Sequence, residues 1–157
     1  MKELPIKKYV KYLFVLAILI FILNKLLIRP WILENKVSEL LLITSFSLPN
    51  LMEAIVGTLI LTGILLQARQ YFNENFGSIK ESHTYLVAVS IASIYVISQE
   101  LKFHNLGGNN VFDYYDIIAS IIGLISTYAM ILLFGFSDEL EIDTRNKNKI
   151  QNSKNEI

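Results

Sequence analysis

The most informative absences from this 157-residue chain are those of cysteine and of any recognisable catalytic motif. Without cysteine there is no disulfide framework, no thiolate metal site and no cysteine nucleophile. The sequence contains no H-E-x-x-H, no G-x-S-x-G, no phosphate-binding loop and no dinucleotide fingerprint, which disfavours the enzymes built on them. The formal net charge of zero gives no support for a nucleic-acid partner, which would require a basic face. We therefore expect no metal, no cofactor and no nucleic acid, and the sequence favours a function other than catalysis.

Charged residues are nearly missing from four windows, and these windows decide the class of protein. A bilayer core of about 30 Å requires roughly 20 mostly apolar residues in a helix. Windows of about that length cover residues 9–28, 49–68, 84–102 and 115–136. They predict an all-α transmembrane bundle of four spanning helices in contact with the lipid bilayer. One domain would cover residues 1–137, followed by a polar cytoplasmic tail over residues 138–157.

The first half of the chain leaves alternatives open. Residues 9–28 follow several lysines, as in a secretory signal peptide, but no A-x-A-like cleavage site follows them, which favours an uncleaved anchor. The second window starts at Pro49, which the first turn of a helix tolerates, and contains Glu53 near the expected interface. Residues 32–46 have one partly apolar helical face, which favours a short interfacial helix over a buried re-entrant segment.

The distribution of basic residues predicts the orientation, because basic residues in short loops tend to stay in the cytoplasm. Four spans place both termini on one side. That side holds Lys2, Lys7, Lys8, Lys11, Arg69, Lys80, Arg145, Lys147, Lys149 and Lys154. The opposite side holds Lys25, Arg29, Lys36 and Lys102. The bias predicts that both termini lie in the cytoplasm.

Four acidic residues are expected at the outer ends of the predicted spans. Glu53 opens the second span, Glu100 closes the third, and Asp113 and Asp116 open the fourth. Ionisable groups at membrane depth are costly and tend to face protein or a water-filled cavity. These four residues are therefore candidates for an outward pocket that holds a ligand or a partner.

A structural interpretation competes with the pocket. Asp113 and Asp116 have the spacing of a capping box, and both suit the positive end of a helix. Glu100 stands in the last turn of its predicted helix, where the helix dipole disfavours a carboxylate, so a basic partner is expected. The candidate partners are Lys102, Lys36 and Arg29.

The fourth window also predicts how its helix packs. Asp116, Ser120, Gly123 and Thr127 recur at helical spacing and share one face, and Ala119 adds a small residue one turn before Gly123. Small and weakly polar residues let transmembrane helices approach closely. The pattern predicts a packing stripe of Ala119, Ser120, Gly123 and Thr127, and it directs the Asp116 carboxylate toward the bundle.

The segment from Ser98 to Gly123 resembles the VanZ-like family of small bacterial integral membrane proteins. In that family a glutamate ends one transmembrane helix, an outer loop follows, and an aspartate stands just before the next helix. A small or amide residue and a glycine then follow within that helix. Here Glu100, Asp116, Ser120 and Gly123 stand at the matching places.

The chain also departs from the family pattern. Phe103 stands where the family usually has a glutamine, and Ser120 stands where an asparagine is common. In the loop, Asn109, Asn110 or Val111 occupies the place of the usual arginine. If these residues form the family's polar site, that site is altered here. The resemblance implies a bacterial plasma-membrane protein of four or five helices, associated in some members with glycopeptide-antibiotic tolerance, and it implies no particular biochemical activity.

Together these features predict a non-enzymatic accessory protein of the bacterial cell envelope. Its outward acidic pocket would engage an envelope component or a partner membrane protein. One alternative is a small transporter or channel subunit, which would have to act as an oligomer because the spans are mostly apolar at mid-depth. Another is a membrane enzyme that acts on lipid-linked substrates, although Lys102 and Arg29 would provide few basic groups to bind a phosphate. The sequence leaves open whether the chain forms a homo-oligomer.

Overall fold

The computed structural model describes residues 4–35, 37–72, 79–100 and 113–138 of the chain. The elements follow in the order α1 (Lys8–Leu23), η1 (Asn24–Ile28), α2 (Arg29–Asn35), α3 (Glu39–Tyr71), α5 (Glu81–Glu100) and α6 (Tyr114–Phe134). Among these residues η1 is a short π-helical segment, and no strand is present. The predicted all-α fold is confirmed for the described part of the chain. The predicted tail lies outside it, except for Asp138.

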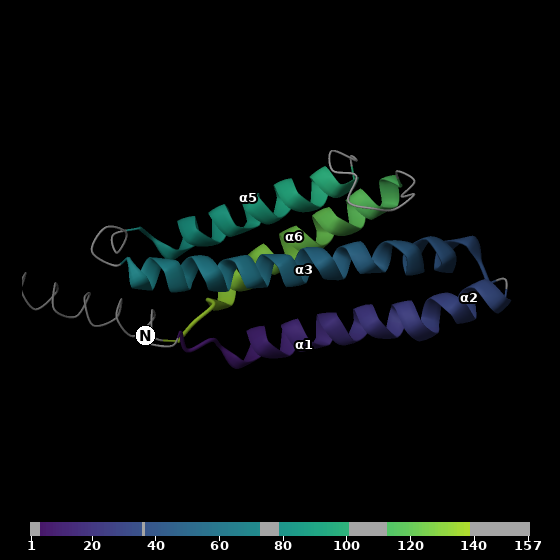
Figure 1. The fold of residues 1–157 in the computed structure, drawn as a ribbon, viewed down its shortest axis with the longest axis horizontal. Coiled ribbons are helices and arrows are strands. Elements are labelled where there is room, and N and C mark those ends of the chain that lie inside the picture. The colour runs from purple at the N-terminus through teal and green to yellow at the C-terminus, as the bar shows by residue number, and fades with distance from the viewer. Residues whose placement is uncertain (1–3, 36, 73–78, 101–112, 139–157) are drawn as a thin grey trace, which may run out of the picture.

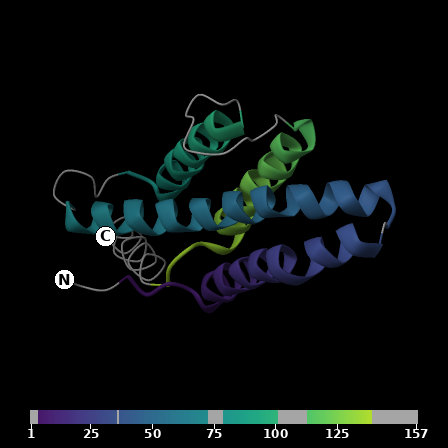
Figure 2. The same cartoon turned by 45° about the vertical axis from the view of Figure 1, so that its right-hand side comes forward.

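The helices are arranged around α3, which packs against α1, α5 and α6. α1, η1 and α2 follow one another as a single rod that runs antiparallel to α3 along one of its sides (Figure 1). α5 and much of α6 lie on the other side of α3, and a view turned by 45° shows the same separation (Figure 2). α6 runs in the same direction as α3, whereas α5 runs in the opposite direction. The most extensive helix contact is between α3 and α6.

Three helical stretches of the described residues are long and apolar enough to cross a membrane. They cover Lys8–Asn35, Glu39–Tyr71 and Tyr114–Phe134. Large apolar side chains on these stretches point away from the bundle, with Leu26 66%, Ile125 62% and Leu133 76% exposed. Such a surface is unfavourable in water but not against lipid tails. The predicted spans 9–28 and 49–68, and nearly all of 115–136, fall within these stretches, whereas α5 is not among the three.

The second span does not begin at Pro49 as the sequence suggests. α3 is a 33-residue helix that starts at Glu39 and continues through Pro49. A proline inside a helix has no N–H for the carbonyl four residues earlier, which here belongs to Ser45. The Asn24 side chain replaces the missing donor, because its Nδ2 donates to the Ser45 carbonyl at 2.8 Å. The Ser45 Oγ in turn donates to Asn24 Oδ1 at 3.0 Å.

Residues 32–46 consequently do not form a helix of their own. They are divided between α2, which ends at Asn35, and the first turns of α3. The expected helix start at Pro49 is absent, and the carbonyl that proline leaves without a donor is satisfied from the neighbouring η1 segment. The two helices form a hairpin at one end of the bundle (Figure 1).

The N-terminal segment and the end of α6 meet at the opposite end of the bundle. The Lys7 N–H donates to the Phe136 carbonyl at 3.1 Å, and the Asp138 N–H donates to the Pro5 carbonyl at 3.1 Å. α6 ends at Phe134, and its C-cap Gly135, whose φ of +70° is readily adopted by glycine, turns the chain toward these contacts. We call this the terminal end. The other end, which holds the end of α5 and the start of α6, is called the acidic end.

Candidate functional site

The packing of α6 on α3 determines where the acidic residues at the start of α6 lie. The predicted packing residues Ala119, Ser120, Gly123 and Thr127 are all buried. A Cβ atom at Gly123 would lie 2.6 Å from the Leu51 carbonyl oxygen and 3.0 Å from the Ala54 Cβ. Only glycine allows this approach of the two backbones. Because α3 and α6 run in the same direction, the start of α6 lies beside the earlier turns of α3.

Asp116 lies about two turns before Gly123 on the same side of α6. Its side chain is half-buried, and its Oδ1 atom is buried without a hydrogen-bond partner among the described residues. Ser120 Oγ donates to the backbone carbonyl of Asp116 at 2.9 Å and therefore does not satisfy this carboxylate oxygen. A buried acceptor without a donor is energetically costly. This oxygen is therefore a place where a donor from a ligand or a partner would be stabilising.

Asp113 has a structural role that the sequence anticipated as an alternative. It is the N-cap of α6, with an extended backbone, and its Oδ1 accepts from the Tyr115 N–H at 2.9 Å. This hydrogen bond satisfies one of the amides that the first turn of a helix leaves without a partner. One carboxylate oxygen of Asp113 is thus engaged in capping the N-terminus of α6.

Glu100 is the last residue of α5, and its side chain lies outside what the structure describes. The backbone positions it at the acidic end, where the end of α5 lies beside the start of α6 (Figures 1 and 2). Two of its expected partners, Lys36 and Lys102, also lie outside the described residues. The third, Arg29, stacks its guanidinium on the Phe46 ring at 3.6 Å from the ring centre.

The structure does not place Glu53 at the level of the other acidic residues. Because α3 starts at Glu39, Glu53 lies about four turns inside the helix, about 21 Å from its start. Its neighbours Leu51 and Ala54 contact Gly123, which lies about 10 Å along α6 from Asp116. Glu53 is half-buried at this deeper level. The predicted group of four therefore separates into three residues at the acidic end and one farther into the bundle.

The sequence analysis did not identify Asn24 and Ser45 as important residues. Both are buried, with Asn24 fully inaccessible and Ser45 4% exposed, and they join η1 to α3 through two hydrogen bonds. Two features of the sequence could have indicated the pair. Asn24 is an amide beside a long apolar run, and Ser45 stands four residues before Pro49, where its carbonyl loses its helical donor.

The fold and these contacts define a helical membrane protein with an acidic end and a terminal end. The described residues contain no group of three or more histidine, aspartate or glutamate side chains that could hold a metal ion. No family model, no curated protein and no solved structure matches this chain.

Proposed function

We propose that this chain is a non-enzymatic accessory protein of the bacterial plasma membrane, resembling VanZ-like proteins. Its acidic end would engage a cationic or amine-bearing envelope component, or a partner membrane protein. The observation that carries this proposal is the Oδ1 atom of Asp116, buried without a donor among the described residues. An ammonium or guanidinium group would supply the missing donor together with a compensating charge. Glu100 and Asp113 belong to the same end and add negative charge there, whereas Glu53 lies too deep to belong to this pocket.

The proposal includes α5 as a fourth span. α5 packs against both α3 and α6, so a bilayer that surrounds those two helices also surrounds α5. Its outward face carries exposed apolar side chains, among them Leu86, Ile91 and Ile94. Its 20 residues correspond to about 30 Å, the thickness of a bilayer core.

The proposed topology places both termini in the cytoplasm and the acidic end outside. The contacts between residues 5–7 and 136–138 support termini on one side, and the basic residues of the sequence favour the cytoplasm for that side. The rod from Lys8 to Asn35 is about 42 Å long and exceeds the bilayer core, so its α2 end would lie in the outer interface. Trp31 is 56% exposed on α2, as expected for an aromatic residue at an interface. Residues 32–46 would accordingly lie at this interface.

The polar residues at mid-depth favour an accessory protein over a conduit formed by one copy. Thr58 and Thr62 are fully buried, and their hydroxyl groups donate to carbonyls of their own helix, one turn earlier. The close contact at Gly123 leaves little space between α3 and α6. A transport function would therefore have to use a path between copies of the chain.

The pocket is tested by neutralising its carboxylate in cells that lack the native gene. We expect the wild-type chain to restore tolerance to a glycopeptide antibiotic, and Asp116→Asn to restore at most a small fraction of it. The amide keeps the size of the side chain but removes the charge that would bind a cation. The minimum inhibitory concentration is the measurement, and a membrane fractionation reports the amount of inserted protein.

Asp138→Asn is the matched control, because Asp138 is an exposed aspartate at the terminal end. It removes the same charge and should leave tolerance unchanged. Glu100→Gln, combined with Asp116→Asn, should abolish any remaining effect. Full tolerance in the double variant at wild-type protein levels would contradict the proposed pocket.

A further inference from the structure

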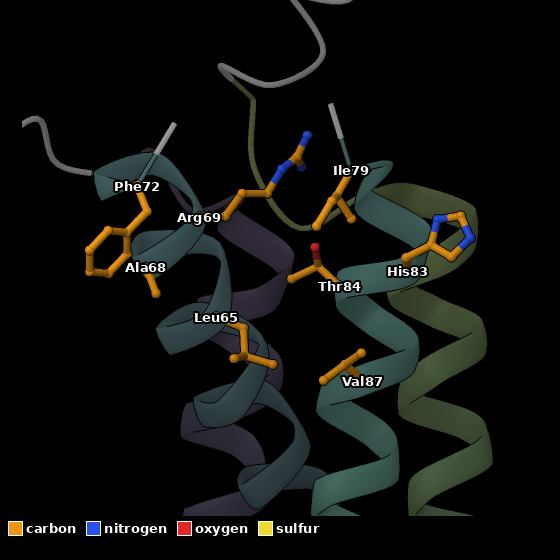
Figure 3. A pocket seen from close by; sticks show the side chains of 8 residues that line it. All are labelled: Leu65, Ala68, Arg69, Phe72, Ile79, His83, Thr84 and Val87. Atoms are coloured by element: carbon orange, nitrogen blue, oxygen red, sulfur yellow. The ribbon is translucent and has the colours of Figure 1, made fainter. Parts of the chain in front are cut away.

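A cavity opens at the terminal end, far from the acidic residues. It lies between the last turns of α3 and the first turns of α5 and has a volume of about 300 Å³. Its lining consists of Leu65, Ala68, Arg69, Phe72, Ile79, His83, Thr84 and Val87 (Figure 3). The volume is at the lower end of the range of about 300–1,000 Å³ that is usual for ligand sites.

The walls of this cavity are apolar, and its mouth carries the Arg69 guanidinium and the His83 imidazole. Leu65 and Val87 lie farthest into the bundle, on facing sides of the cavity (Figure 3). Arg69 and His83 lie nearer the ends of the two helices, and the guanidinium of Arg69 extends toward the end of the bundle (Figure 3). Lys80 is exposed directly before α5 and adds a further positive charge on this side. The cavity therefore combines an apolar slot with a basic rim.

The position of the rim matches the headgroup region of a bilayer. Phe136, just past the end of α6, lies beside Gly63 of α3. A Cβ atom built on Gly63 would lie 3.6 Å from the Phe136 ring. Arg69 lies nearly two turns farther along α3, about 9 Å beyond the end of the apolar α6 helix. A long basic side chain at this level keeps its charge in the interface while its stem covers apolar surface.

Among the described residues, the acidic side chain of α5 that stands closest to the rim along the helix is engaged elsewhere. The nearest described carboxylate on α5 is that of Glu81, which accepts a hydrogen bond from the Tyr85 hydroxyl at 2.8 Å. Tyr85 is buried and its hydroxyl also accepts from the Phe136 N–H, so this pair lies on the side of α5 that faces the end of α6. Arg69 also interacts within the protein, and a guanidinium with five donors can bind a phosphate in addition.

We infer that this cavity binds an anionic phospholipid, with part of an acyl chain between Leu65 and Val87, the phosphate at Arg69, and His83 at the outer edge of the rim. The apolar slot fits hydrocarbon, and the rim fits a phosphate that carries no compensating ammonium group. The N-terminal end of α5 adds the partial positive charge of the helix dipole on the same side. With the proposed orientation, the lipid belongs to the cytoplasmic leaflet, where anionic lipids attract basic residues. Binding itself does not depend on that orientation.

The test uses the full chain, purified in a neutral detergent and observed by native mass spectrometry. Phosphatidylglycerol and phosphatidylcholine with identical acyl chains are titrated separately. We expect at least one phosphatidylglycerol to stay bound under conditions that remove phosphatidylcholine. Equal retention of the two lipids would overturn the inference, because apolar contacts alone do not distinguish them. Glycerol phosphate at the same concentration should not displace the lipid, and displacement would show a site for free phosphate in place of a lipid.

Two variants distinguish the contribution of the rim to lipid binding from that of the apolar slot. Arg69→Gln combined with His83→Gln should weaken phosphatidylglycerol binding by at least about fivefold, since one arginine near a membrane surface contributes about a factor of five. Ala68→Leu fills the slot, keeps Arg69 and His83 and should also reduce binding. Lys8→Gln is the control for charge, because Lys8 is exposed at the same end but does not line the cavity. Unchanged lipid retention in folded samples of both cavity variants would overturn the site.

Discussion

A single buried asparagine allows the longest helix of this protein to pass through a proline. Asn24 donates to the Ser45 carbonyl that Pro49 leaves without its helical donor, and it accepts from the Ser45 hydroxyl. Interhelical hydrogen bonds in membrane proteins contribute about 0.6 kcal/mol on average and up to about 1.7 kcal/mol. The Asn24 pair belongs to the upper part of this range, because its loss leaves a buried carbonyl without a donor.

We expect Asn24→Ala to lower the free energy of unfolding in detergent micelles by about 1–2 kcal/mol. Asn35→Ala is the matched control, because within the described part of the chain the Asn35 amide donates to the Trp31 carbonyl, one turn earlier on an exposed part of its own helix. Its effect should be less than about 0.5 kcal/mol. Pro49→Ala restores an N–H for the Ser45 carbonyl, so it should reduce the cost of Asn24→Ala in a double-mutant cycle. Additive effects would show that the two residues do not act on the same carbonyl.

At the scale of the elements, the contact between α3 and α6 depends on one glycine. A Cβ atom at Gly123 would meet the Leu51 carbonyl oxygen, which belongs to the backbone of α3 and cannot move independently of its helix. Gly57 also lies in α3 but has no atom within 4 Å of a built Cβ. The two glycines therefore predict opposite effects of the same substitution.

We expect Gly123→Ala to destabilise the bundle by about 1–3 kcal/mol, because α6 must move away from α3. Gly57→Ala should be neutral or stabilise it by up to about 1 kcal/mol, since alanine favours a helix more than glycine does. Unfolding of both variants in the same micelles is the measurement. A Gly123→Ala protein as stable as Gly57→Ala would contradict the observed helix contact.

For the whole molecule, the proposed number of spans predicts which ends of the helices face outward. The chain contains no cysteine, so single cysteines can be introduced without other changes. We expect Glu39→Cys and Tyr114→Cys to react with a membrane-impermeant maleimide in intact cells. Lys8→Cys and Lys80→Cys should react only after lysis, because Lys8 begins α1 and Lys80 directly precedes α5, both at the terminal end. Labelling of positions 80 and 114 from the same side would show that α5 does not cross the membrane.

Most of the helical structure follows from local sequence. Long apolar runs such as Ile117–Phe134 must form helices in lipid, because no solvent there satisfies an open backbone. The limits of the helices were predicted less well at Pro49, where the expected helix start depends on whether a remote residue supplies the missing donor. Only part of the candidate site could be predicted, for a similar reason. Asp113 and Asp116 are local features of one helix start, whereas the depth of Glu53 in the bundle depends on where α3 begins.

By itself, the sequence determined that this chain is helical, that its apolar segments suit a membrane and that acidic residues stand beside the start of α6. These properties depend on residues near one another along the chain, whose composition decides between lipid and water. Only the tertiary structure decided that Asn24 completes α3, that Gly123 brings α6 against Leu51, and that Arg69 and His83 share the rim of one cavity. Each of these features joins residues far apart in sequence, and no local pattern specifies which helix faces which.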